Sequence, residues 1–276
     1  MRGFVITMMS MSLILILMAL SMSLRSNHDA TERVLMEPLP LIYAAFLLDD
    51  TAYEFNSIIG PEIAFNETNE SLSISVKDTL HAYNHSSDIS AYSAFLGSEL
   101  ALSTESNITT NFTNMTGGTV RVFLDEDYEY VNDHTNSEIT FTKDGGTGAD
   151  SYDISFAVYS LRQNVTHMAF NESGTLNVTI HYTDLNGTDT EEGSVFPNDY
   201  NVFEVQYPNG TRFVVNAGLV GGNPASMRLK TYGTWAEVSW TADLPPLNET
   251  IKRGYEYDAS IDYSQGPVKV SRRIGK

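Results

Sequence analysis

The stretch Thr175–Tyr182, which reads TLNVTIHY, alternates apolar and polar side chains at every step. Leu176, Val178 and Ile180 fall on one side of an extended chain, and a period of two residues is that of a β-strand with one face in a core. Asn177 and Thr179 fall on the other side, and together they form an Asn-x-Thr glycosylation acceptor, or sequon. Because an oligosaccharide must point into solvent, this stretch predicts a half-buried strand whose polar face is exposed.

The same alternation recurs along most of the chain on either side of this strand. Polar turn sequences separate the repeats, such as Asp144-Gly145-Gly146 and Asn186-Gly187. Eight or more short strands with polar turns favour a mostly antiparallel β-sandwich or jelly-roll-like domain over residues 61–276. The predicted strands lie at residues 71–76, 119–124, 153–158, 176–182, 203–207, around 213–215, 236–240 and 255–263.

Sequons occur twelve times in this chain, where composition alone would place about four. This excess predicts an N-glycosylated domain in an extracytoplasmic compartment. The longest stretches without a sequon lie between Asn114 and Asn164, between Asn209 and Asn248, and beyond Asn248, so they are candidates for buried or subunit-facing surface. The predicted acceptors are Asn66, Asn69, Asn84, Asn107, Asn111, Asn114, Asn164, Asn171, Asn177, Asn186, Asn209 and Asn248.

Composition restricts the possible partners and the ways of stabilising the domain. The chain has no cysteine, so no disulfide supports it, which favours a prokaryotic surface over an animal secreted glycoprotein. Its formal charge of −19 disfavours nucleic acid as a partner and suits a solvated acidic surface. Four basic residues, Lys269, Arg272, Arg273 and Lys276, stand apart in the last eight positions, as a solvated terminus or a segment that docks on an acidic neighbour.

The amino-terminal region carries an apolar segment. Residues Phe4–Leu24 contain no charge over 21 positions, which is long enough for a helix to span a bilayer with the bulk of the chain outside. A cleaved secretory signal peptide is the alternative, with Ala19-Leu20-Ser21 as a small-x-small site. The sequence thus divides into a short amino terminus at 1–3, an apolar helix at 4–24, an amphipathic helix at 25–60 and the β domain.

The segment 25–60 shows helical periodicity after an interruption at Pro38 and Pro40. Apolar residues recur there at spacings of three and four, which predicts one packed helix face, and Gly60-Pro61 predicts its end. The predicted seam comprises Leu41, Ala45, Leu48, Ala52, Phe55 and Ile59.

The amino-terminal sequence RGFVITMM resembles the processing site of archaeal type IV pilin-like proteins. The resemblance implies that residues 1–3 are a short leader, which a prepilin peptidase removes by cleavage between Gly3 and Phe4, with the apolar helix retained. It implies an α+β fold, in which a long hydrophobic N-terminal helix precedes the β domain. It also implies a structural subunit of a cell-surface filament, held in the membrane before assembly and then joined to other copies through that helix by the pilus assembly machinery.

Other patterns are candidates for sites of chemistry. Gly145–Asp150 matches one copy of a calcium-binding β-roll motif, and Asp184, Asn186, Asp189, Glu191 and Glu192 form an oxygen-rich cluster. Asp125, Glu126, Asp127 and Glu129 suggest a solvated strand edge, and His81 and His85 share the i, i+4 spacing of zinc ligands without a third ligand. We expect no metal, no cofactor and no enzymatic activity. The alternatives to a filament subunit are a non-polymerising membrane-anchored envelope glycoprotein or adhesin, and a surface hydrolase of β-sandwich fold.

Overall fold

The structure is a computed structural model, and it describes residues 38–67, 71–80, 85–124, 127–145, 148–158, 166–168, 170, 173–185, 187–245 and 254–275. Strands dominate these residues and form two sheets. Sheet A has six strands in the order β1 (Glu62–Glu67), β2 (Leu72–Leu80), β14 (Ala236–Leu244), β7 (Ser151–Ala157), β9 (Leu176–Asp184) and β10 (Gly187–Val195). All of its pairings are antiparallel except that of β7 with β9.

Sheet B contains the remaining strands, which are all paired antiparallel. Its order is β16 (Val268–Gly275), β15 (Tyr255–Gln265), β4 (Thr119–Leu124), β5 (Tyr128–Asp133), β6 (Glu138–Lys143), β13 (Asn223–Tyr232), β12 (Arg212–Val220), β11 (Tyr200–Gln206) and β8 (Thr166–Met168). A further strand, β3 (Asn107–Asn111), pairs with β15.

The two sheets pack face to face because most of the central strands bury every second side chain. Phe156 of sheet A stacks on Phe213 of sheet B with ring centroids 3.8 Å apart, and Trp240 lies 4.7 Å from Phe141 across the same interior. These rings are almost fully buried. Burial of aromatic surface of this size is the main stabilising contribution that a cysteine-free domain has available.

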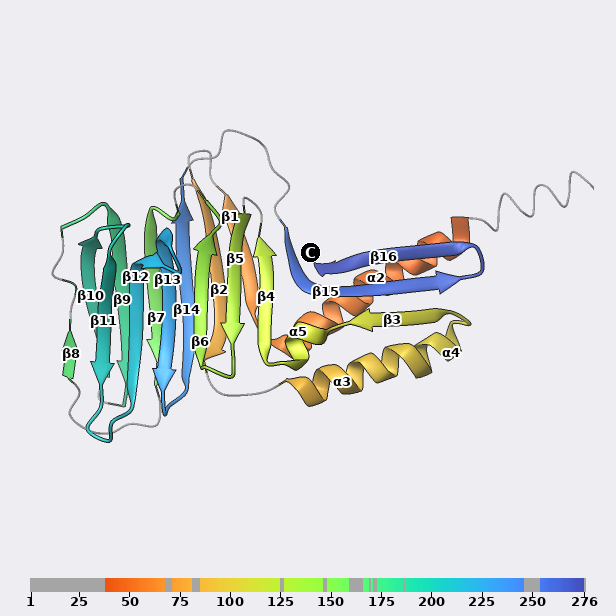
Figure 1. Cartoon of the computed structure of the whole chain (residues 1–276), viewed down its shortest axis with the longest axis horizontal. Coiled ribbons are helices and arrows are strands. Elements are labelled where there is room, and N and C mark those ends of the chain that lie inside the picture. Colours follow the sequence, from red (N-terminus) through yellow and green to blue (C-terminus); the bar gives the residue numbers. More distant parts are fainter. Residues whose placement is uncertain are drawn as a thin grey trace, which may run out of the picture.

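A second region extends from one end of the sandwich (Figure 1). There β15 leaves its pairing with β4 and continues between β16 and β3. Helix α2 (Pro38–Ile59) packs against β15 and β16, and its Phe55 stacks on Phe112 with ring centroids 4.9 Å apart. The other helical elements here are α3 (Ser86–Phe95), the π-helix η1 (Leu96–Leu100), α4 (Ala101–Ser103) and α5 (Thr113–Thr116).

Helix α2 differs in detail from the predicted packed face. The helix is described from Pro38 onward, and it ends before Gly60, whose φ of +90° suits glycine. Leu48, Phe55 and Ile59 are buried as the spacing suggests, but Ala45 is exposed. Over residues 44–51 the buried residues also include Ala44, Leu47 and Thr51, so there the packed face lies about one position before the predicted seam.

The predicted fold class, α+β with a long hydrophobic N-terminal helix, is wrong for the chain that the structure describes. That part is mostly β, and its helices are accessory to two sheets. None of the described helices combines the length and the apolar character needed to cross a bilayer, which corrects the predicted transmembrane and pilin-like layout as well. The segment Phe4–Leu24, from which that layout was predicted, lies outside the described residues.

Candidate functional site

The sequons form the most extensive candidate site, and six of the twelve acceptor asparagines lie in described parts of the chain. All six are exposed: Asn66, Asn107, Asn111, Asn114, Asn177 and Asn209. The exposure of Asn177 follows from its place on β9, where Leu176 and Val178 point into the core. Asn107 and Asn111 occupy equivalent outward positions on β3. Each of these residues is therefore accessible from solvent, as attachment of a glycan requires, although Asn114 Nδ2 donates to Asp258 Oδ2 at 2.6 Å.

The described asparagines that are buried, in contrast, do not belong to sequons. Asn132, Asn201 and Asn216 are each no more than 5 % exposed, and none of them precedes a Ser or Thr at the second position. Asn201 shows why such residues are internal, because its amide donates to the carbonyl oxygens of Phe196 at 2.8 Å and of Asp199 and Ala217 at 2.9 Å. Among the described residues, no buried asparagine thus belongs to a sequon.

Two sequons adopt a local geometry that leaves the acceptor nitrogen unobstructed. At Asn209, the backbone N–H and the hydroxyl of Thr211 donate to Oδ1 at 3.0 and 2.7 Å. Thr113 makes the same pair of bonds to Oδ1 of Asn111, at 3.4 and 2.9 Å. These are Asx turns, in which the side-chain carbonyl mimics a backbone carbonyl. The sequon threonine therefore holds the amide oxygen, so that Nδ2 remains on the solvent side.

The other predicted acceptors and the processing site lie outside the described residues. They are Asn69, Asn84, Asn164, Asn171, Asn186 and Asn248, together with Gly3 and Phe4. Glycosylation at these asparagines and cleavage between Gly3 and Phe4 therefore stay predictions from the sequence.

The two calcium candidates show structural contacts in the described residues. At the Gly145–Asp150 loop, the N–H of Ala149 donates to Ala225 O at 3.1 Å and that of Asp150 to Asp243 O at 2.8 Å. A Cβ on Gly148 would come within 2.3 Å of Ala225 O, so glycine permits this close approach. In the second cluster, Asp184 accepts a 2.8 Å hydrogen bond from Tyr182, and Asn186 is not described.

The acidic cluster at residues 125–129 and the pair His81 and His85 lie only partly within the described residues. Glu129 pairs with Arg121 at 2.7 Å on the surface of sheet B, while Asp125, Glu126 and His81 lie outside the described residues. The ring of His85 lies 5.0 Å from that of His134. Across the described ranges, no three His, Cys, Asp or Glu side chains are grouped so that they could hold a metal ion.

Three of the four carboxyl-terminal basic residues, Lys269, Arg272 and Arg273, lie on strand β16, and Lys276 lies outside the described residues. Arg272 on β16 pairs with Asp49 of α2 at 2.7 Å, and Arg273 lies 3.7 Å from Glu256 of β15. Asp49 and Arg272 also line a cleft of about 450 Å³ between α2 and the β15–β16 hairpin, together with Tyr53, Asn56 and Tyr257. The segment thus docks on acidic residues of its own chain.

Sequence reasoning missed a buried polar cluster around Asp78. This carboxyl lies on the inward side of β2, in line with Ile74, Val76 and Leu80, and it is 8 % exposed. Asp78 Oδ2 accepts from the Tyr130 hydroxyl and from Asn132 Nδ2, the latter at 2.8 Å, and Oδ1 accepts from the N–H of Thr79 at 2.7 Å. The alternation of β2, continued past Val76, would have placed an aspartate in the core.

Burial sets the electrostatics of this cluster. Removal from water raises the pKa of Asp78 above its ordinary value, against hydrogen bonds from Tyr130, Asn132 and Thr79 and the charge of His85, which act to lower it. Burial likewise raises the pKa of Tyr130, and the negative charge of Asp78 adds to that rise. The cluster links β2 of sheet A to β5 of sheet B through polar contacts within the core.

The chain matches no known protein family, no curated protein and no solved structure.

Proposed function

We propose that this chain is an extracytoplasmic glycoprotein of the cell surface, in which a cysteine-free β domain serves a structural or binding role and not a catalytic one. The observation that carries this proposal is the partition of asparagines. Every described sequon asparagine is exposed, whereas the described asparagines that are buried, Asn132, Asn201 and Asn216, all lie outside sequons. In a chain that is not glycosylated, nothing would require the asparagines of sequons to be exposed and the buried asparagines to lie outside sequons.

The polar groups that could have suggested catalysis are engaged in contacts that hold the fold together. Asp78 is bonded within the core, and Asp49 joins β16 to α2 through Arg272. The acidic surface and the exposed amides instead suit a solvated, glycan-coated exterior. This proposal takes up the envelope-glycoprotein alternative and makes no use of an N-terminal filament helix.

Glycopeptide mass spectrometry on protein from the native host tests the proposal. We expect modification at Asn66, Asn107, Asn111, Asn177 and Asn209. Asn136 and Asn198 are matched internal controls, because both are exposed but neither begins a sequon, and they should be unmodified. An intact mass equal to that of the unmodified polypeptide would overturn the proposal.

A further inference from the structure

The sequon-free stretches of the sequence come together in space. The stretch between Asn114 and Asn164 supplies β4, β5 and β6 of sheet B and β7 of sheet A, and the stretch between Asn209 and Asn248 supplies β12 and β13 of sheet B and β14 of sheet A. The five strands that belong to sheet B are neighbours there, in the order β4-β5-β6-β13-β12, and the next strand, β11, also lacks a sequon. We call the outward side of these six strands the sheet B face. The outward side of sheet A, the sheet A face, carries Asn66 and Asn177.

Charge distinguishes the two faces as clearly as the sequons do. The sheet A face presents one basic and five acidic side chains, namely Lys77 against Glu62, Asp153, Glu192, Glu237 and Asp243. The sheet B face presents four of each sign, namely Arg121, Arg212, Arg228 and Lys230 with Glu129, Asp133, Glu138 and Glu204. In a chain of net charge −19, the sheet B face is therefore locally neutral.

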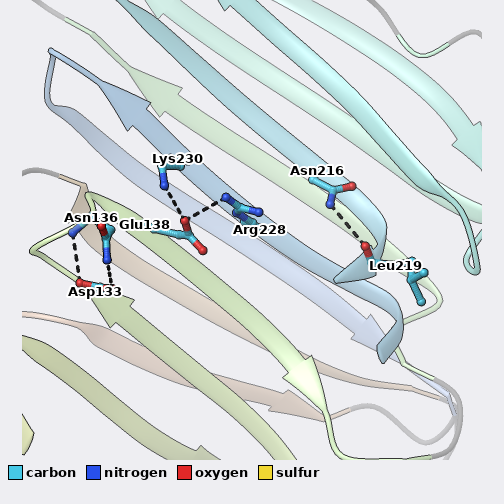
Figure 2. Close-up of polar contacts among 7 residues, drawn as sticks. All are labelled: Asp133, Asn136, Glu138, Asn216, Leu219, Arg228 and Lys230. Carbon is cyan, nitrogen blue, oxygen red and sulfur yellow. Dashed lines mark hydrogen bonds and ion pairs between the residues drawn. The ribbon is translucent and has the colours of Figure 1, made fainter. Parts of the chain in front are cut away.

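Seven of the eight charges of the sheet B face are paired with one another, the exception being Asp133. Glu138 accepts from Lys230 Nζ at 2.9 Å and lies 3.1 Å from Arg228 Nη2, as Figure 2 shows. Arg212 pairs with Glu204 at 3.3 Å, and its guanidinium lies 4.0 Å from the ring centroid of Tyr232. Asp133 has no cationic partner in the described residues, but it accepts from Asn136 Nδ2 at 2.6 Å. Covering the face therefore leaves each of these charged groups with a hydrogen-bonding or ionic partner, and an unpaired buried charge is the costliest kind of ionic burial.

We infer that the sheet B face binds a second copy of this chain, face to face. Two molecules that each carry −19 repel least where their contacting surfaces are neutral, and a positively charged partner would instead favour the acidic sheet A face. A self-complementary contact between identical patches is the usual geometry of a homodimer. The inference rests on the proposed function, since glycans on the sheet A face leave sheet B as the open side of the sandwich.

The sequence offers a sharp test, because single substitutions create new sequons on either face. Glu138→Asn places an asparagine two residues before Thr140, at the centre of the sheet B face. Asp153→Asn places one two residues before Ser155 on the sheet A face and is the matched control. The full chain, purified from the native host, would be measured by size-exclusion chromatography with light scattering, and occupancy of the new site by mass spectrometry. We expect a dimer for the parent and for Asp153→Asn, and a monomer for occupied Glu138→Asn.

Two further variants separate the possible causes of failure. Glu138→Gln removes the charge without creating a sequon, so it should remain dimeric if the glycan and not the lost ion pair blocks the contact. The chain has no cysteine, so Thr140→Cys and Ser155→Cys each carry a single thiol for a bis-maleimide cross-linker. We expect a cross-linked dimer only for Thr140→Cys.

The outcomes distinguish the inference from the proposed function. A monomeric parent, a dimer that survives an occupied glycan at position 138, or cross-linking only through Ser155→Cys would overturn the inference alone. Unmodified native sequons would overturn the proposed function, and the thiol pair would still report on the face.

Discussion

The sheet A and sheet B faces arise from the same period-two alternation, yet they differ in sequons and in charge. Outward positions of sheet A include Asn66 and Asn177 and carry mostly acidic charges, whereas those of sheet B have balanced charges linked largely by ion pairs. Their inward positions do not differ in this way, because both sheets contribute aromatic and branched side chains to one core. The difference between the faces is therefore one of surface chemistry, and folding of the core does not require it.

The largest expected effect concerns the core that both faces share. Trp240 of sheet A is 3 % exposed and packs on Phe141 of sheet B, whereas Trp235, the only other tryptophan, is 42 % exposed. We expect Trp240→Ala to lower the free energy of unfolding by about 3–5 kcal/mol, because it leaves a cavity between the sheets. Trp235→Ala should cost no more than about 0.5 kcal/mol. Denaturant titration followed by circular dichroism measures both, and equal effects would contradict a shared core at Trp240.

A second prediction contrasts buried and exposed asparagine. Asn201→Ala removes a donor shared by three carbonyl oxygens, so we expect a loss of roughly 2 kcal/mol in the free energy of unfolding. Asn177→Gln on the sheet A face should change it by no more than about 0.5 kcal/mol while abolishing the glycan at that position. The same titration gives both values, and a large cost at Asn177 would show that the sequon has a structural role.

The third prediction concerns pH and the carboxyl that lies between the two sheets. The folded protein holds the Asp78 proton more tightly than the unfolded chain does, because burial raises the pKa. The contribution of Asp78 to the free energy of unfolding is therefore fully present below about pH 4, and it is lost as the pH rises through the folded pKa. The free energy of unfolding should fall over that range by at most about 1.4 kcal/mol per pH unit. Asp78→Asn should remove this slope.

Unfolding titrations of the parent and of Asp78→Asn at a series of pH values test this expectation. The exposed change Glu62→Gln, which creates no sequon, controls for the loss of one negative charge. An Asp78→Asn curve parallel to that of the parent would show that the carboxyl does not titrate differently in the folded and unfolded states.

These contrasts also show how far the sequence predicts the molecule. Alternation predicts the strand at residues 176–182 and the exposure of Asn177, because both depend on neighbours within one strand. It could not place β14 between β2 and β7, or pair β7 with β9 in parallel, because pairing is decided by contacts far apart in the chain. Helix α3 was missed, since its buried residues Ile89 and Tyr92 give only a short helical pattern. The neutral sheet B face appears only once those pairings bring separate stretches together.

The smallest expected effect tests the surface charges themselves. Glu138 and Lys230 are about one-fifth exposed and 2.9 Å apart, whereas Glu62 and Lys77 on the sheet A face are about three-quarters and two-thirds exposed and 4.0 Å apart. Water and salt screen the second pair much more strongly, so its contribution should be near zero. We expect Glu138→Gln to lower the free energy of unfolding by about 1 kcal/mol at low salt, and Glu62→Gln to leave it unchanged. Repeating both titrations in high salt should shrink the Glu138 effect, because screening weakens a partly exposed pair. If the two variants behave alike at both salt concentrations, the ion pairs of the sheet B face are no more than solvated surface, and its neutrality contributes to association but not to the fold.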